Sequence, residues 1–123
     1  MTVVALGPAV VDLTGIRAGD QNMLSMTVTV GGVPYDLTDK VVTAQARKTA
    51  NDPVALDAVV AVTAPTAGQF TLRWPGDAVS VLLGSATTWK GVWDVQVQAA
   101  GQDALTLLAG KFTAVLDVTR PAP

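Results

Sequence analysis

The chain has 123 residues, of which half are apolar and 15% are charged, and its net charge is −2. This length predicts one domain with its own core, and the slightly acidic balance excludes a basic surface for nucleic acid. Because Cys and His are absent, a thiol nucleophile, disulfides, a histidine base and the usual zinc sites are excluded.

The first 13 residues are apolar without a clear period. They include Val3, Val4 and Leu6 but no Lys or Arg, and the first basic residue is Arg17. We therefore expect no signal peptide, and no apolar run reaches the roughly 20 residues that span a bilayer. Residues 1–13 are predicted to be either a first strand or an arm that docks on a neighbouring protein.

Alternation of apolar and polar residues predicts strands in the first part of the chain. It is clearest over Leu24–Val30, and Gly31-Gly32 then predicts a tight hairpin, since such turns require positive φ. Further strands are expected over residues 33–37, 41–48, 54–62 and 69–74. The only predicted helix covers Asp77 to Leu83, with Asp77 as its N-cap and with Ala78, Val81 and Leu82 on one face.

The last part of the chain is predicted to form a long hairpin. Trp89 opens a strand region whose inward row continues through Trp93, and Gly101-Gln102-Asp103 forms the turn. The final strand region covers residues 105–118, with Gly110 as the expected bulge where the alternation resets.

These segments predict an all-β domain of roughly seven or eight short antiparallel strands in two packed sheets, with one short connecting helix. We expect the sandwich over residues 14–120, after the segment 1–13 and before a stiff tail at 121–123. The predicted core consists of apolar residues in the inward rows: Met26, Val28, Phe70, Leu72, Trp74, Trp93, Val95, Val97, Phe112 and Leu116.

Candidate sites are few. Three tryptophans lie close in sequence and suggest a sugar pocket, but Trp74 and Trp93 fall in inward rows, which favours core packing. Trp89 remains the exposed candidate. Asp36 and Asp39 bracket a turn that is better explained by side chains capping their own backbone than by a metal. No pattern of acids, Ser–Lys pairs or phosphate loops indicates an enzyme, so no catalytic, metal or cofactor residue is predicted.

Several short motifs occur in a familiar order. Gly19-Asp20 precedes the first clear strand, Asp36-Leu37-Thr38-Asp39 precedes a strand that ends at Arg47, and Gly91-Val92-Trp93-Asp94 opens a late strand. This order resembles the small immunoglobulin-like domain of tailed-phage structural proteins, as in the N-terminal part of baseplate upper proteins. Two departures are that Asp39 replaces the usual Gly and that Trp93 replaces Tyr before Asp94.

The resemblance implies an immunoglobulin-like β-sandwich and a non-enzymatic virion component of the tail, tail tip or baseplate. Its expected partners are copies of itself and other virion proteins, including the major capsid protein, without nucleic acid, membrane or cofactor. Val3, Val4, Leu6, Trp89 and Arg120 are the candidate interaction residues. A capsid decoration protein of the same fold and a carbohydrate-binding module remain alternatives, and an enzyme is the least favoured. The motifs do not distinguish head from tail, and they leave copy number and host open.

Overall fold

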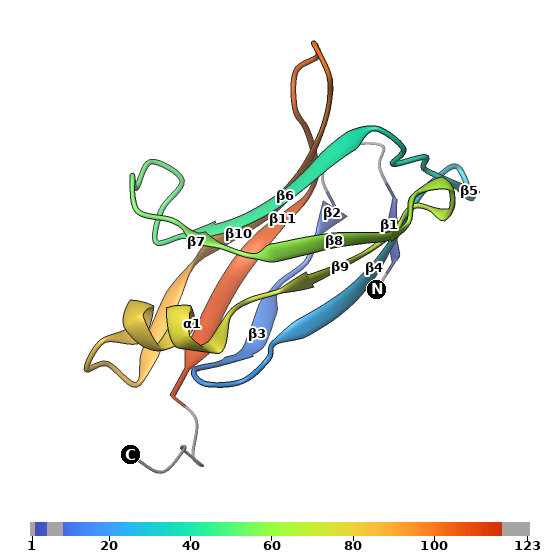
Figure 1. The fold of residues 1–123 in the computed structure, drawn as a ribbon. Helices are drawn as coiled ribbons and strands as arrows, with labels where there is room; N and C mark the ends of the chain where they lie inside the picture. The colour runs from blue at the N-terminus through green and yellow to red at the C-terminus, as the bar shows by residue number, and fades with distance from the viewer. Residues whose placement is uncertain (1, 5–8, 117–123) are drawn as a thin grey trace.

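The computed structural model describes residues 2–4 and 9–116, which form two β-sheets packed face to face (Figure 1). The first sheet has the order β1-β4-β9-β8, with β5 paired to β4; the second has the order β2-β11-β10-β6-β7, with β3 paired to β11. The strands of the first sheet are β1 (Thr2–Val4), β4 (Met23–Val30), β5 (Val33–Pro34), β8 (Val59–Ala64) and β9 (Gln69–Arg73). Those of the second are β2 (Ala9–Val10), β3 (Leu13–Arg17), β6 (Lys40–Arg47), β7 (Leu56–Asp57), β10 (Thr88–Ala99) and β11 (Leu105–Val115).

The strand order is that of an immunoglobulin-like sandwich. Strands β4, β9 and β8 of the first sheet take the places of strands B, E and D, and β6, β10 and β11 take those of C, F and G. One α-helix, α1 (Gly76–Leu83), follows β9 and leads toward β10, and the 3₁₀ turn η1 (Pro65–Ala67) joins β8 to β9. The predicted all-β immunoglobulin-like sandwich with one short connecting helix is therefore confirmed. No helix in the described part of the chain is long and apolar enough to cross a membrane.

The core lies between the inward rows of the two sheets. Nine of the ten residues expected there are buried: Met26, Val28, Phe70, Leu72, Trp74, Trp93, Val95, Val97 and Phe112. The tenth, Leu116, is half-buried just beyond the end of β11. Trp74 joins the sheets, because its ring packs edge-on against Phe112 at 4.9 Å and against Trp93 at 6.0 Å between ring centroids.

The segment expected as one strand over residues 54–62 is instead divided between the sheets. Leu56–Asp57 pairs with β6 in the second sheet, and Val59–Ala64 pairs with β9 in the first. The chain changes sheets at Ala58, whose N–H donates to the carbonyl oxygen of Ala44 at 2.9 Å. This crossover explains why the alternation over residues 54–62 is irregular, since the two halves face different sheets.

The helix forms where expected, and Ala78 and Leu82 of its expected face are partly buried against the core. Val81 of that face is 83% exposed instead, and the fully buried residues are Val79 and Leu83. The cap also differs from the expectation. Pro75 is the N-cap residue, and Asp77 lies in the first turn, where its carboxylate accepts a hydrogen bond from Ala78 N–H at 2.9 Å. A helix of two turns has too few positions for its period alone to fix the buried face.

The bulge in the last strand is at Leu107 rather than at Gly110. Val95 pairs with Leu108 and Gln96 with Thr106, so Leu107 is the extra residue, and both leucines are buried. Gly110 pairs with Trp93 in regular register. A Cβ on Gly110 would overlap the carbonyl oxygen of Val11, so the glycine is required for the close approach of the N-terminal segment.

The N-terminal segment contributes strands to both sheets. Thr2–Val4 runs parallel to β4, and Ala9–Val10 and Leu13–Arg17 run parallel to β11. Within residues 1–13, the described structure has the short strands Thr2–Val4 and Ala9–Val10. Two tight turns match the sequence analysis: Gly31 and Gly32, both at positive φ, join β4 to β5, and the turn around Gly101 joins β10 to β11.

Candidate interaction surface

A groove that is partly open to solvent lies on the outer face of the second sheet. Its volume is about 750 Å³, and it is lined by the outward rows of β6 and β10 together with β2, β11 and the β6–β7 loop: Val10, Thr43, Gln45, Arg47, Ala50, Val92, Trp93, Asp94, Gln96, Ala109 and Gly110. Alternation produces this lining, since Val42, Ala44 and Ala46 turn inward and leave Thr43, Gln45 and Arg47 outside. We call this feature the outer groove.

Hydrogen bonds hold the β6 side of the outer groove in place. Arg47 donates from Nη1 to the carbonyl oxygen of Asp52 at 2.6 Å and from Nη2 to Oε1 of Gln45 at 3.0 Å. Gln45 in turn donates from Nε2 to Oδ1 of Asp57 at 2.6 Å. Because the guanidinium and amide are each braced by a neighbour, they lose little side-chain entropy when a partner binds.

Asp94 is the half-buried acid of the outer groove. Desolvation by burial raises the pKa of its carboxyl, and the positive charge of Arg47 and a hydrogen bond from Gln96 lower it in part. That hydrogen bond is long, at 3.5 Å from Nε2 of Gln96 to Oδ2 of Asp94. The carboxylate therefore retains capacity to accept a stronger hydrogen bond from a donor on a partner.

Exposed valines border these polar groups. Val10 is 83% exposed on β2, and Val92 is partly exposed on β10; both line the outer groove. A face that combines exposed apolar side chains with braced polar groups is typical of protein–protein contact surfaces.

The aspartates of the described residues do not form a metal site. No group of three lies close enough to hold an ion within residues 2–4 and 9–116. Asp36 instead caps its own turn, because its Oδ1 accepts hydrogen bonds from Thr38 Oγ1 at 2.6 Å and from Thr38 N–H at 2.9 Å. These bonds, the side-chain one first, hold the pKa of Asp36 below its ordinary value.

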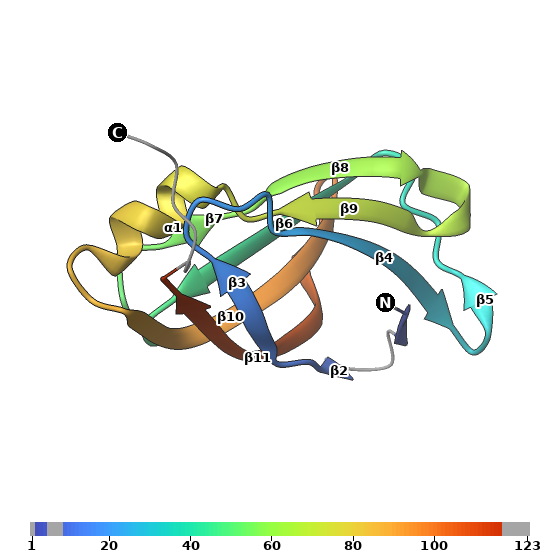
Figure 2. The same cartoon turned by 90° about the horizontal axis from the view of Figure 1, so that it is seen from below.

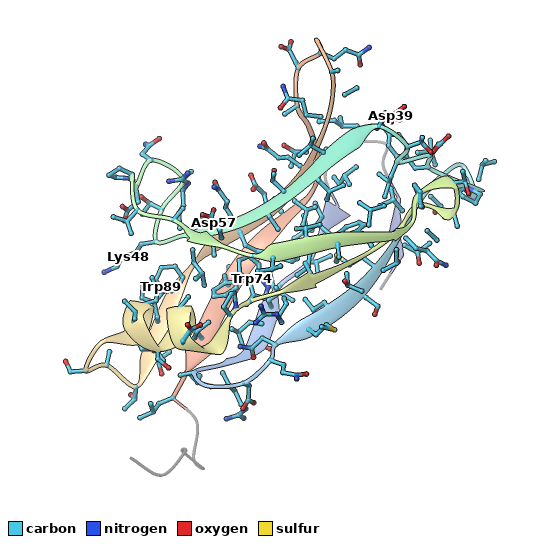
Figure 3. All side chains as sticks on the ribbon, in the orientation of Figure 1. Asp39, Lys48, Asp57, Trp74 and Trp89 are labelled. Carbon is cyan, nitrogen blue, oxygen red and sulfur yellow. The ribbon has the colours of Figure 1, made fainter. Side chains whose placement is uncertain are left out.

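Two of the three tryptophans lie in the core, and the third packs against it. Trp74 and Trp93 are buried, and their rings are nearly perpendicular, at 77°. Trp89, expected to be exposed, is half-buried within β10, and its ring packs edge-on against Phe112 with 5.8 Å between centroids. Trp74 lies between the sheets and Trp89 lies near α1 (Figure 3). They therefore do not present the coplanar exposed rings that stack on sugars.

The other candidate interaction residues are not brought into the outer groove by the described structure. Val3 and Val4 lie in β1 on the first sheet, and Leu6 and Arg120 lie outside the described residues. Asp94 and Arg47, by contrast, were not singled out as site residues. The sequence signal that could have indicated them is the alternation in β10, which places Asp94 and Gln96 on the outer face and Trp93 and Val95 on the inner face.

No family profile and no curated protein matches this chain. Among solved structures, the chain is similar to the N-terminal domain of phage TP901-1 ORF48, with a TM-score of 0.48 and 13% sequence identity over 94% of each chain.

Proposed function

We propose that this protein is a non-enzymatic structural component of a tailed-bacteriophage virion, in the tail, tail tip or baseplate, which acts through protein–protein contacts. The observation that carries the proposal is the outer groove, where exposed valines lie beside the braced side chains of Arg47 and Gln45 and the half-buried Asp94. Such a surface suits another protein, because it is partly open to solvent and combines exposed apolar side chains with fixed polar partners.

The positions of the sequence motifs in the fold support the virion assignment. Gly19-Asp20 lies just before β4, and the turn Asp36–Asp39 leads into β6, which ends at Arg47. The Trp93-Asp94 pair lies in β10, the penultimate strand. The first two motifs therefore fall at the structural positions that the resemblance to phage immunoglobulin-like domains implies, whereas Trp93-Asp94 lies within β10 rather than at its start.

The proposed partners are copies of this chain and other virion proteins. A net charge of −2 without a basic stripe argues against nucleic acid as the partner. A capsid decoration protein of the same fold would use the same kind of surface and is the second candidate. A carbohydrate-binding module is less favoured, since Trp74 and Trp93 are buried and Trp89 is half-buried.

The test is size-exclusion chromatography with light scattering of the purified chain, alone and mixed with tail, baseplate or capsid proteins. We expect co-elution with one of them at fixed stoichiometry, which would also distinguish tail from head. Val92→Asp should weaken that complex at least about tenfold by placing a charge at the contact. The matched control is Val81→Asp on α1, at a side chain that is 83% exposed and does not line the groove.

Binding to none of the virion proteins would contradict the proposal. Equal loss of binding in Val81→Asp and Val92→Asp would show instead that the outer groove is not the contact surface.

A further inference from the structure

Strand β8 is an open edge of the first sheet. It pairs with β9 on one side only, and Figure 2 shows it at the border of the sheet, beyond β9. Among the described residues, no backbone hydrogen bond other than those to β9 involves residues 59–64. Because a strand points its N–H and C=O groups alternately to its two sides, β8 presents a row of backbone donors and acceptors to an incoming strand.

This edge lacks most devices that protect natural sheet edges. No charged residue occurs from Ala58 to Leu72, and β8 itself reads Val-Val-Ala-Val-Thr-Ala. Natural edges usually carry a Lys, an inward charge or a Pro to prevent pairing with another chain. The irregular register between Val62 and Ala64 ends the regular stretch, which leaves residues 59–62 as the flat part of the edge.

The side of the sandwich beside this edge is open as well. Val62 pairs with the buried Phe70 in the inward row, yet 38% of its surface is exposed. A groove of about 290 Å³ lies between β6 and β8, lined by Val42, Thr43, Ala44, Gln45, Asp57, Ala58 and Val60. Apolar side chains of the inward rows are thus uncovered along β8, where an added strand would cover them.

We propose that β8 pairs antiparallel with β8 of a second copy of this chain, about a two-fold axis at Ala61. This register places Val60 opposite Val62 of the second copy and Ala61 opposite itself. Val–Val pairs stabilise antiparallel strands, and the uncharged strand can meet its own copy without like-charge repulsion. A two-fold axis perpendicular to the sheet keeps both inward rows on one face, so the two first sheets would form one continuous sheet. This dimer does not depend on the proposed virion role.

Charge substitutions at Ala61 test this register, because its side chain is exposed and lies on the proposed axis. Sedimentation equilibrium from micromolar to millimolar concentration should show a dimer of the native chain. Ala61→Lys and Ala61→Asp should each weaken dimerisation at least about tenfold, since two like charges then face each other across the axis. A 1:1 mixture of the two variants should restore a dimer, because Lys then faces Asp.

The matched control is Val81→Lys, which adds the same charge at an 83% exposed valine on α1, outside both sheets, and should dimerise like the native chain. Circular dichroism melts check that every variant is folded. A native chain that stays monomeric throughout, an Ala61→Lys variant that dimerises unchanged, or a mixture that stays monomeric would overturn the proposal. Failure of the chain to bind virion proteins would leave the dimer result unaffected, so the two proposals fail separately.

Discussion

The indole Nε1 of Trp93 donates a hydrogen bond to the backbone carbonyl oxygen of Val11, with 2.8 Å between the two atoms. This bond joins the middle of β10 to the N-terminal segment between β2 and β3, and the two bonded residues are 82 positions apart in sequence. The same oxygen lies directly over Gly110 of β11. Trp93 and Gly110 therefore fix together where the N-terminal segment crosses the second sheet.

The two buried tryptophans should differ in their tolerance of phenylalanine. Trp93→Phe removes the donor to Val11 and leaves a carbonyl oxygen without that bond, and we expect a loss of about 2–3 kcal/mol in the free energy of unfolding. Trp74→Phe removes a similar volume, but Nε1 of Trp74 has no hydrogen-bond partner among the described residues. Its loss should therefore be smaller by about 1 kcal/mol or more.

Urea denaturation of both variants measures this difference. Trp93→Ala provides the upper limit, at a loss of about 3–5 kcal/mol for a buried aromatic residue. Equal losses for the two phenylalanine variants would mean that the hydrogen bond to Val11 contributes nothing to stability.

Gly110→Ala should destabilise the domain by about 1–3 kcal/mol, because the added methyl group would overlap the backbone of Val11 and the strands must move apart. Gly15→Ala in β3 is the control, since a Cβ there meets no atom within 4 Å and the residue is not at positive φ. Thermal melts of both variants give the comparison. A harmless Gly110→Ala would show that the N-terminal segment does not pack on β11 as described.

Alternation of apolar and polar residues is sufficient to predict a strand, and its buried residues, where the whole strand belongs to one sheet. Met26 and Val28, Phe70 and Leu72, and Trp93 each lie in a clean alternating row, and each is buried. The alternation fails at Ala58, because period two indicates which side a residue faces but not which sheet its strand joins. The sequence pattern predicts a bulge at Gly110. The structure shows that this position needs glycine because the backbone of Val11, which is distant in sequence, lies against it.

The outer groove could not be predicted from the sequence either, because it depends on which strands pair with each other. Asp94 and Arg47 become neighbours only because β10 pairs with β6, with Asp94 opposite Gln45 and Val92 opposite Arg47. No local pattern specifies that pairing. Trp89, expected to be exposed, lies in β10, which begins at Thr88, and its ring packs on Phe112.

Asp39→Gly should stabilise the domain. Asp39 has φ = +61°, in the left-handed region that favours glycine. Its exposed side chain makes no hydrogen bond within the described part of the chain. We expect a gain of about 0.5–1 kcal/mol, measured by urea denaturation.

The control is Asn22→Gly, at the other non-glycine residue of positive φ among the described residues, with φ = +48°. The Asn22 side chain accepts a hydrogen bond from Arg17 N–H at 2.9 Å and donates to the carbonyl oxygens of Arg17 and Trp74 at 2.8 and 3.1 Å. Losing these bonds should cost about 1–3 kcal/mol, more than the relief of strain. Destabilisation by Asp39→Gly would show that the aspartate has a role in the turn beyond its backbone conformation.

Asp94→Asn should stabilise the folded state at neutral pH and not in acid. Burial raises the pKa of Asp94 above its ordinary value of 3.8, so the ionised carboxylate is less stable in the folded protein than in the unfolded chain. The native state therefore binds more protons than the unfolded chain, and this residue's contribution to stability falls as pH rises through that range. Asparagine removes the charge, and the gain at pH 7 should be below about 1 kcal/mol because the outer groove is open to solvent.

The pH dependence separates this effect from a change in packing. The stability advantage of Asp94→Asn over the native chain should shrink as pH falls toward 3.8 and vanish below it, where the carboxyl is neutral in both states. Asp36→Asn is the opposite control: hydrogen bonds from Thr38 lower the pKa of Asp36, so its removal should cost stability at neutral pH and nothing in strong acid. Urea denaturation from pH 7 down to about pH 2 measures both curves. If Asp94→Asn changes stability equally at every pH, its effect comes from shape or hydrogen bonding, and the partly desolvated charge described in the groove is not the cause.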